Sequence, residues 1–160
     1  MATEGSSQFS NIKRSFEKWF ATNLGGTYAT DYDGVPFDSS NKSEWLQPRL
    51  LIGGRQFHRH VDSSSNAYRG NTVNIIANIN IFVKKGINQP ADRIQRIRDG
   101  VFEKMKENTI ITVYDFTGGG TEVATMKSRE IITDREIISN DTESPRQWNF
   151  SVVYTYLEKY

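Results

Sequence analysis

Residues 73–83 read Val-Asn-Ile-Ile-Ala-Asn-Ile-Asn-Ile-Phe-Val, and this stretch decides the fold. Apolar side chains stand at every odd position from Val73 to Val83, and asparagines stand at three of the positions between them. Successive side chains of an extended chain point to opposite faces, so this period of two predicts a β-strand with one core face. The asparagine face is expected to lie toward solvent or toward a partner.

Two amphipathic helices are predicted on either side of this strand. The first runs from about Ser7 to about Asn23, with an apolar face formed by Phe9, Ile12, Phe16, Trp19 and Phe20. The second follows Pro90 and ends near Asn108, with a stripe formed by Ile94, Ile97, Val101 and Met105. Its arginines, Arg93, Arg96 and Arg98, are expected on the solvated side.

The remaining strands are expected at four places. Residues 27–32 are prone to form a strand, and residues 45–52 form another in which Pro48 requires an edge position or a bulge. Residues 110–116 follow the second helix, and residues 122–139 are expected to hold two strands with a polar break at 133–135. The closing strand, 148–157, is rich in aromatic residues and is therefore predicted to be central in the sheet.

Residues 55–69 carry no period and include a Ser63-Ser64-Ser65 run, which predicts a long loop or hairpin tip. This loop is the candidate contact with a neighbouring subunit or a partner. The residues expected to carry the contact are Arg55, His58, Arg59, His60, Tyr68 and Arg69.

Together these elements predict an α+β fold, a mixed and mainly antiparallel sheet with both helices packed on one face. One domain, residues 8–160, follows a flexible N-terminus of residues 1–7. The other sheet face is expected to need cover from another subunit at Ile76, Phe82 and Leu157.

Composition limits the function classes. The 160 residues carry a formal net charge of +1, so no basic surface calls for a nucleic-acid partner. There is no cysteine, which excludes a thiolate nucleophile and a disulfide framework. Neither a signal peptide nor a membrane span is expected, so the protein is predicted to be soluble and to have no membrane partner.

The chemical motifs favour a structural interpretation. His58, His60 and Asp62 cluster in sequence, but the adjacent arginines oppose a bound cation. Residues 118–120 are three glycines without the spacing of a phosphate loop, and Asp31, Asp33 and Asp38 lack the spacing of a calcium loop. We therefore predict no catalytic residue, no metal site and no cofactor.

Two short motifs, Val35-Pro36-Phe37 in the turn of residues 32–37 and Trp45-Leu46 in the next strand, resemble those of bacteriophage tail terminator (tail completion) proteins. The order of helices and strands after about Ser7 is similar as well. The resemblance implies a non-enzymatic virion protein, assembled in the host cytoplasm and placed at the head-proximal end of the tail. It implies a ring, in this family a hexamer, that caps the tail tube protein, ends its polymerisation and docks the head connector or neck protein. Genome DNA passes through such a ring without specific binding.

Two alternatives stay open from the sequence. The first is a neck or head-completion protein. Such proteins can share the fold of tail terminators and differ mainly in which partner they cap. A small metal-dependent hydrolase or ligand-binding domain would use His58, His60 and Asp62.

Overall fold

The computed structural model of the protein describes residues 7–61, 67–86 and 88–159. Helix α1 (Ser7–Phe20) continues directly into a π-helical turn, η1 (Ala21–Gly25). Helix α2 (Arg93–Met105) follows the first two strands. The strands are β1 (Glu44–Val61), β2 (Ala67–Val83), β3 (Ile110–Asp115), β4 (Thr121–Ile137) and β5 (Arg146–Lys159).

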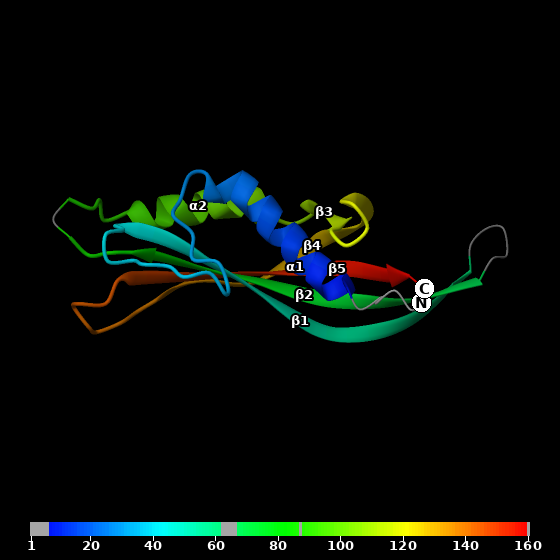
Figure 1. The fold of residues 1–160 in the computed structure, drawn as a ribbon. Coiled ribbons are helices and arrows are strands. Elements are labelled where there is room, and N and C mark those ends of the chain that lie inside the picture. Colours follow the sequence, from blue (N-terminus) through cyan, green and yellow to red (C-terminus); the bar gives the residue numbers. More distant parts are fainter. Residues whose placement is uncertain (1–6, 62–66, 87, 160) are drawn as a thin grey trace.

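The five strands form one antiparallel sheet in the order β1-β2-β5-β4-β3. Both helices lie on the same side of this long, curved sheet (Figure 1). The predicted α+β class with two helices on one face is therefore confirmed. The aromatic strand β5 is central, as its composition predicted.

The core lies between the helices and the inner face of the sheet. The odd positions of β2 from Val73 to Val83 are buried, and the even positions are exposed or half-buried, as the period of two predicted. All four residues of the α2 stripe are buried, and so are Ile12, Phe16 and Phe20 of α1. On β5 the inner face contributes Phe150, Val152, Tyr154 and Tyr156.

Two expectations about strands are wrong. Residues 27–32 form no strand; only Thr30 makes an isolated parallel bridge, to Leu46. Residues 122–139 hold one strand, β4: residues 133–135, where the break was expected, pair regularly with β5, and two register shifts precede them, between Ser128 and Glu130 and between Ile131 and Thr133. A bulge inserts an extra residue without ending the strand, which is why the period of two was lost there.

The first strand lies at the sheet edge, as Pro48 required, but it is longer than residues 45–52. Its pairing with β2 shifts register between Ile52 and Arg55. Gly53 lies at this bulge, where an added Cβ would stand 2.9 Å from the carbonyl oxygen of Asn74. Only glycine permits this close approach, and the strand continues beyond it to Val61.

The expected flexible N-terminus falls on residues 1–6, outside the described residues, except that Ser7 already belongs to α1. No helix in the described part of the chain is long and apolar enough to cross a membrane.

Tyr154 offers a test of the core. Its side chain is fully buried on β5, and its hydroxyl has no hydrogen-bond partner in the structure. Burial alone raises the pKa of this phenol, because water no longer stabilises the phenolate. An unsatisfied hydroxyl costs folding free energy, so we predict that Tyr154→Phe raises the free energy of unfolding by about 1 kcal/mol.

Urea unfolding of the two proteins measures this difference. Loss of stability in Tyr154→Phe would show that the hydroxyl has a partner in solution, for example a buried water.

Candidate assembly surfaces

The predicted contact residues lie on a β-hairpin and not in a loop. Arg55, His58, Arg59 and His60 belong to β1, and Tyr68 and Arg69 belong to β2. Their backbones are paired, with His60 opposite Tyr68 and Arg59 opposite Arg69. Residues 62–66, with Asp62 and the serine run, lie outside the described residues. Of the two forms predicted for residues 55–69, a long loop or a hairpin tip, the structure has the hairpin, and a loop is wrong for the paired residues.

This hairpin forms an arm that extends beyond the rest of the sheet. Strand β5 ends opposite Gly70, so Arg59–Val61 and Ala67–Arg69 pair only with each other in the described part of the chain. In Figure 1 the ends of β1 and β2 run past both helices and past β5. Two strands alone are only marginally stable in water, so an arm of this kind gains from contact with another surface.

The arm also concentrates positive charge. Residues 55–69 include three arginines and one aspartate, whereas the whole chain is nearly neutral. Arg59 and Arg69 stand directly across the ladder from each other.

The sheet face away from the helices carries a network of amide side chains. Asn149 donates from Nδ2 to Oδ1 of Asn78 at 2.6 Å and to Oδ1 of Asn80 at 2.8 Å. Gln147 donates to Asn80 Oδ1 at 3.1 Å, and Asn80 in turn donates to Gln47 Oε1 at 3.2 Å. The network thus crosses three strands, β1, β2 and β5. The asparagine face that the sequence indicated is real, but its amides are largely paired with one another.

Asp31 anchors one end of this network. Its carboxylate accepts hydrogen bonds from Gln47 Nε2 at 2.7 Å and from Arg49 Nη2 at 3.3 Å, and its carbonyl accepts another from Arg49 Nη1 at 2.7 Å. The backbone next to Asp31 follows the edge of β1, because Leu46 N–H donates to Ala29 O and Asp31 N–H donates to Leu46 O. Asp31 therefore fixes residues 29–31 to the sheet. The sequence singled out Asp31 only as part of a candidate calcium loop, which its spacing excluded.

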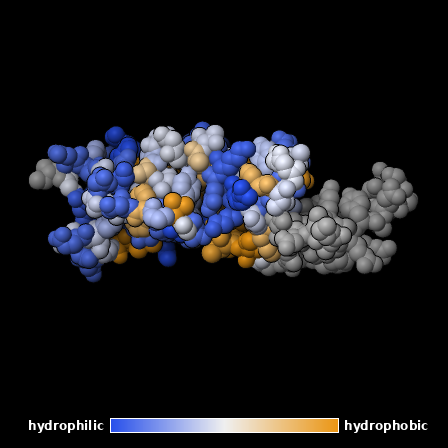
Figure 2. All heavy atoms as spheres, in the orientation of Figure 1, coloured by the Kyte–Doolittle hydropathy of each residue, from blue (hydrophilic) through white to orange (hydrophobic). Residues whose placement is uncertain are grey.

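A row of aliphatic side chains adjoins the amides. Leu51, Ile76 and Val153 are directly paired across β1, β2 and β5, and Leu51 is 54% exposed. Apolar residues also gather along the lower margin of the molecule, on the side away from the helices (Figure 2). Ile76 and Phe82, which were expected to need cover, are half-buried, and Phe82 stacks on Trp45 with the ring centroids 5.0 Å apart. The side chain of Leu157 lies outside those described.

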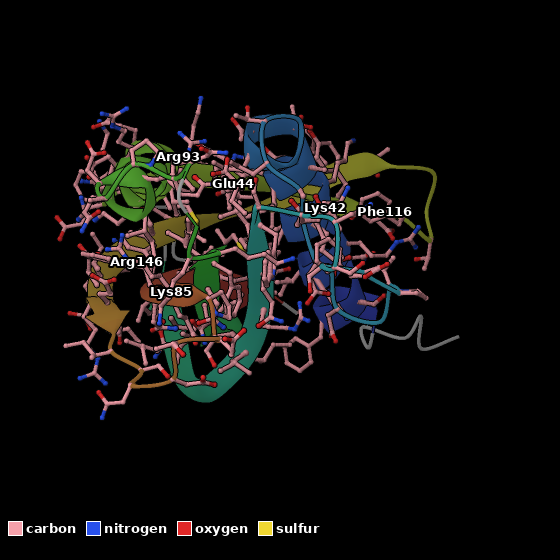
Figure 3. The ribbon with its side chains drawn as sticks, turned by 90° about the vertical axis from the view of Figure 1, so that its left-hand side faces the viewer. Lys42, Glu44, Lys85, Arg93, Phe116 and Arg146 are labelled. Carbon is pink, nitrogen blue, oxygen red and sulfur yellow. The ribbon has the colours of Figure 1, made fainter. Side chains whose placement is uncertain are left out.

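Arginine side chains link helix α2 to β1 and to β4. Arg93 forms a two-point ion pair with Glu44 of β1, at 2.5 and 2.7 Å. Both residues are labelled in Figure 3. Arg98 pairs with Asp134 of β4, whose Oδ1 also accepts a hydrogen bond from Trp148 Nε1 at 2.8 Å. The expectation of a solvated arginine face is therefore wrong for these two, while Arg96 pairs locally with Asp92.

Loops gather at the end of the sheet opposite the arm. Lys84 donates from Nζ to the carbonyls of Ser39 and Ser40, and Lys85 donates to the carbonyl of Asp141. Beside them lies an open hollow of about 270 Å³, with Ile138, which is 88% exposed, on its rim. Arg146 lines it too, but its guanidinium is already bonded to Glu136 and to the carbonyl of Ala91. The hollow holds no free charged group that points to a ligand.

The glycine run and the histidine pair are the other chemical motifs of the sequence. Gly119 and Gly120 adopt positive φ values of 96° and 79° in the turn between β3 and β4. Among the residues that the structure describes, no group of three or more His, Cys, Asp or Glu side chains could hold a metal ion. His58 and His60 lie on β1, separated by one residue, and Asp62 is outside the described range.

No protein-family model matches the chain, and no curated protein matches it. Solved structures do match the chain, and one of them has a TM-score of 0.60 at 11% sequence identity, over 92% of this chain and 94% of that one. At this identity the likeness concerns the fold alone, and it extends over nearly the whole of both chains.

The Asp134 pair gives a prediction with a pH dependence. Burial raises the pKa of this carboxyl, but the hydrogen bonds from Arg98 and Trp148 outweigh it, so the net shift is downward. A carboxyl with a lowered pKa in the folded state stabilises above its unfolded pKa of about 3.9, and this contribution is lost as the pH falls through the folded value. We predict that Asp134→Asn costs about 1–2 kcal/mol at pH 7.

Chemical unfolding at pH 7 and at pH 3 measures this cost, which should shrink at the lower pH. Asp99→Asn is the matched control, because Asp99 contacts the same arginine but is 67% exposed, and it should change stability little. Equal costs for the two variants would contradict the prediction.

Proposed function

We propose that this protein is a structural subunit of a phage tail, which assembles into a ring that caps the tail tube and presents a docking surface for the head connector. The observation that carries the proposal is the projecting β1–β2 arm, a two-stranded extension with a basic sequence that pairs with no further strand in the described part of the chain. The short motifs at residues 35–37 and 45–46 add the resemblance to tail terminators. In this proposal the protein is not an enzyme, and its partners are copies of itself, the tube protein and the connector.

A closed ring of identical subunits needs two different complementary patches on each subunit. The arm extends from one end of the sheet, and the loops around Lys84, Lys85 and Asp141 form the other end (Figure 1). The two ends differ in shape, because one is a two-stranded extension and the other a group of loops. Contact of the arm with a different surface on the next copy is the arrangement that a ring would use.

The amide-rich sheet face suits a role beside passing DNA. The amide side chains of Asn78, Asn80 and Asn149 are uncharged, the guanidinium of Arg49 opposite Asn78 is paired with Asp31, and Arg135 opposite Asn149 is the charge that borders the network on β4. Each phosphate that a protein neutralises adds salt-sensitive affinity, so a wall of paired amides would hold DNA weakly. A neck protein that caps another partner has the same requirements, and the identity of the bound partner separates the two.

Shortening the arm tests the proposal. Phe57 and Asn71 are directly opposite each other, so Asn-Gly can replace residues 58–70 as a two-residue turn without changing the register. We predict that the wild-type protein forms sixfold rings, while the shortened variant stays monomeric with an unchanged core. Mass measurement over a concentration series, with negative-stain imaging, follows the assembly, and thermal unfolding checks the fold.

A pair of charge reversals refines the test. Arg59→Glu with Arg69→Glu should weaken assembly, whereas Lys104→Glu with Lys106→Glu, at exposed positions on α2 and at its C-cap, changes the net charge equally and should not. If the wild-type protein remains monomeric at every concentration and a purified tube protein does not recruit it, the proposal is wrong.

A further inference from the structure

We infer that α1 is a cap on the free edge of β3, and that this edge is a latent surface for pairing with β3 of a second copy of this chain. Strand β3 is the outermost strand on its side of the sheet. The backbone groups on an outer edge are free to pair with another chain unless something covers them. This inference concerns the margin opposite the arm and does not depend on the proposed ring.

Two polar side chains of α1 make the cap. Ser15 accepts a hydrogen bond at Oγ from the N–H of Tyr114 at 2.9 Å, and Asn11 accepts one at Oδ1 from the N–H of Phe116 at 3.1 Å. Asn11 also donates from Nδ2 to Asp115 Oδ1 at 3.3 Å. Both Ser15 and Asn11 are buried, at 1% and 6% exposure.

Their burial makes this arrangement informative. Serine and asparagine within a helix are unfavourable and are usually turned to solvent, yet here they face the sheet edge one helical turn apart. They supply acceptors to alternate N–H groups, at residues 114 and 116, as a neighbouring strand would. The helix therefore replaces a strand at this part of the edge.

Two cation–π contacts involve the aromatic rings of the same two residues, Tyr114 and Phe116. The guanidinium of Arg14 lies 4.4 Å from the ring centre of Phe116, and the ammonium of Lys18 lies 4.2 Å from that of Tyr114. The contacts bring positive charge to the rim of the edge. Charged groups at this position oppose the approach of an identical edge.

The sequence of β3 explains why a cap is needed and which partner it excludes. Residues 110–114 read Ile-Ile-Thr-Val-Tyr, with strong strand propensity and no charge, proline or glycine. Segments of this composition pair with identical copies when their edges are exposed. Ile110 is 58% exposed at the start of the strand.

The test removes the two acceptors. Asn11→Ala with Ser15→Ala should self-associate at a concentration about tenfold below that of the wild type, because the Tyr114 and Phe116 N–H groups become available. The matched control is Ser10→Ala with Asn23→Ala, which makes the same two chemical changes on the same helical segment away from β3. Adding Ile110→Lys to the double variant places a charge on the edge and should restore the wild-type threshold.

Light scattering over a concentration series gives the threshold, and thioflavin fluorescence reports intermolecular strands. A folded double variant with the wild-type threshold, or association that Ile110→Lys does not reverse, would overturn the inference. If the double variant does not fold, amide hydrogen exchange on the single variants decides. Ser15→Ala should then unprotect Tyr114 and Asn11→Ala should unprotect Phe116, and unchanged protection at both amides would overturn it equally.

Discussion

The uninterrupted pairing of β2 with β5 is the constraint on which the rest of the structure depends. The ladder runs in one register from Gly70 opposite Lys159 to Val83 opposite Arg146. This register places Ile75 and Tyr154 together under the helices and Asn80 opposite Asn149 on the far face. A slip of one residue would turn every one of these side chains to the wrong face. The apolar core and the amide network therefore specify the same pairing from opposite sides of the sheet.

The elements that could be predicted are those that face the core. In β2, β5 and α2 the buried positions recur with the period of a strand or a helix, because each has one apolar and one polar face. The outer part of β1 could not be predicted in the same way. The register shift between Ile52 and Arg55 interrupts the alternation, and Arg59–Val61 extend beyond the end of β5, so the segment shows no period of two and resembled a loop.

The other missed features depend on distant partners. The two register shifts in β4 lie on either side of Ile131. They interrupt the alternation of the two faces there, so the sequence shows no strand period. The contacts of Asp31 with Gln47 and Arg49 join residues 16 and 18 positions apart, and Arg98 reaches Asp134 over 36 positions. The sequence indicated the asparagine face, since that rests on local alternation. It could not indicate which side chains would anchor the face or hold α2 across the sheet.

The two edges of the sheet are covered or interrupted in different ways along their length. Near the start of β1, residues 29–31 bond to Leu46, and Pro48 lacks the N–H that another strand would need. On the opposite side α1 covers the edge of β3. Register shifts interrupt β4 just beyond the point where β3 begins. Charges, bulges and covering segments are the usual means by which proteins prevent edge-to-edge association. In the arm, Arg59–Val61 and Ala67–Arg69 continue the regular pairing of β1 with β2 beyond the end of β5.

This asymmetry bears on how a subunit could end a polymer. A strand added to an open edge always presents a new open edge, so pairing at both margins would propagate as a filament. With α1 in place of a further strand, growth by strand addition stops at β3. An open arm at one end and a capped edge on the other side allow one directed contact per subunit. The cap on β3 therefore supports the proposed function by a route independent of the arm, because a terminating ring has to bind its neighbours without offering a surface for further growth.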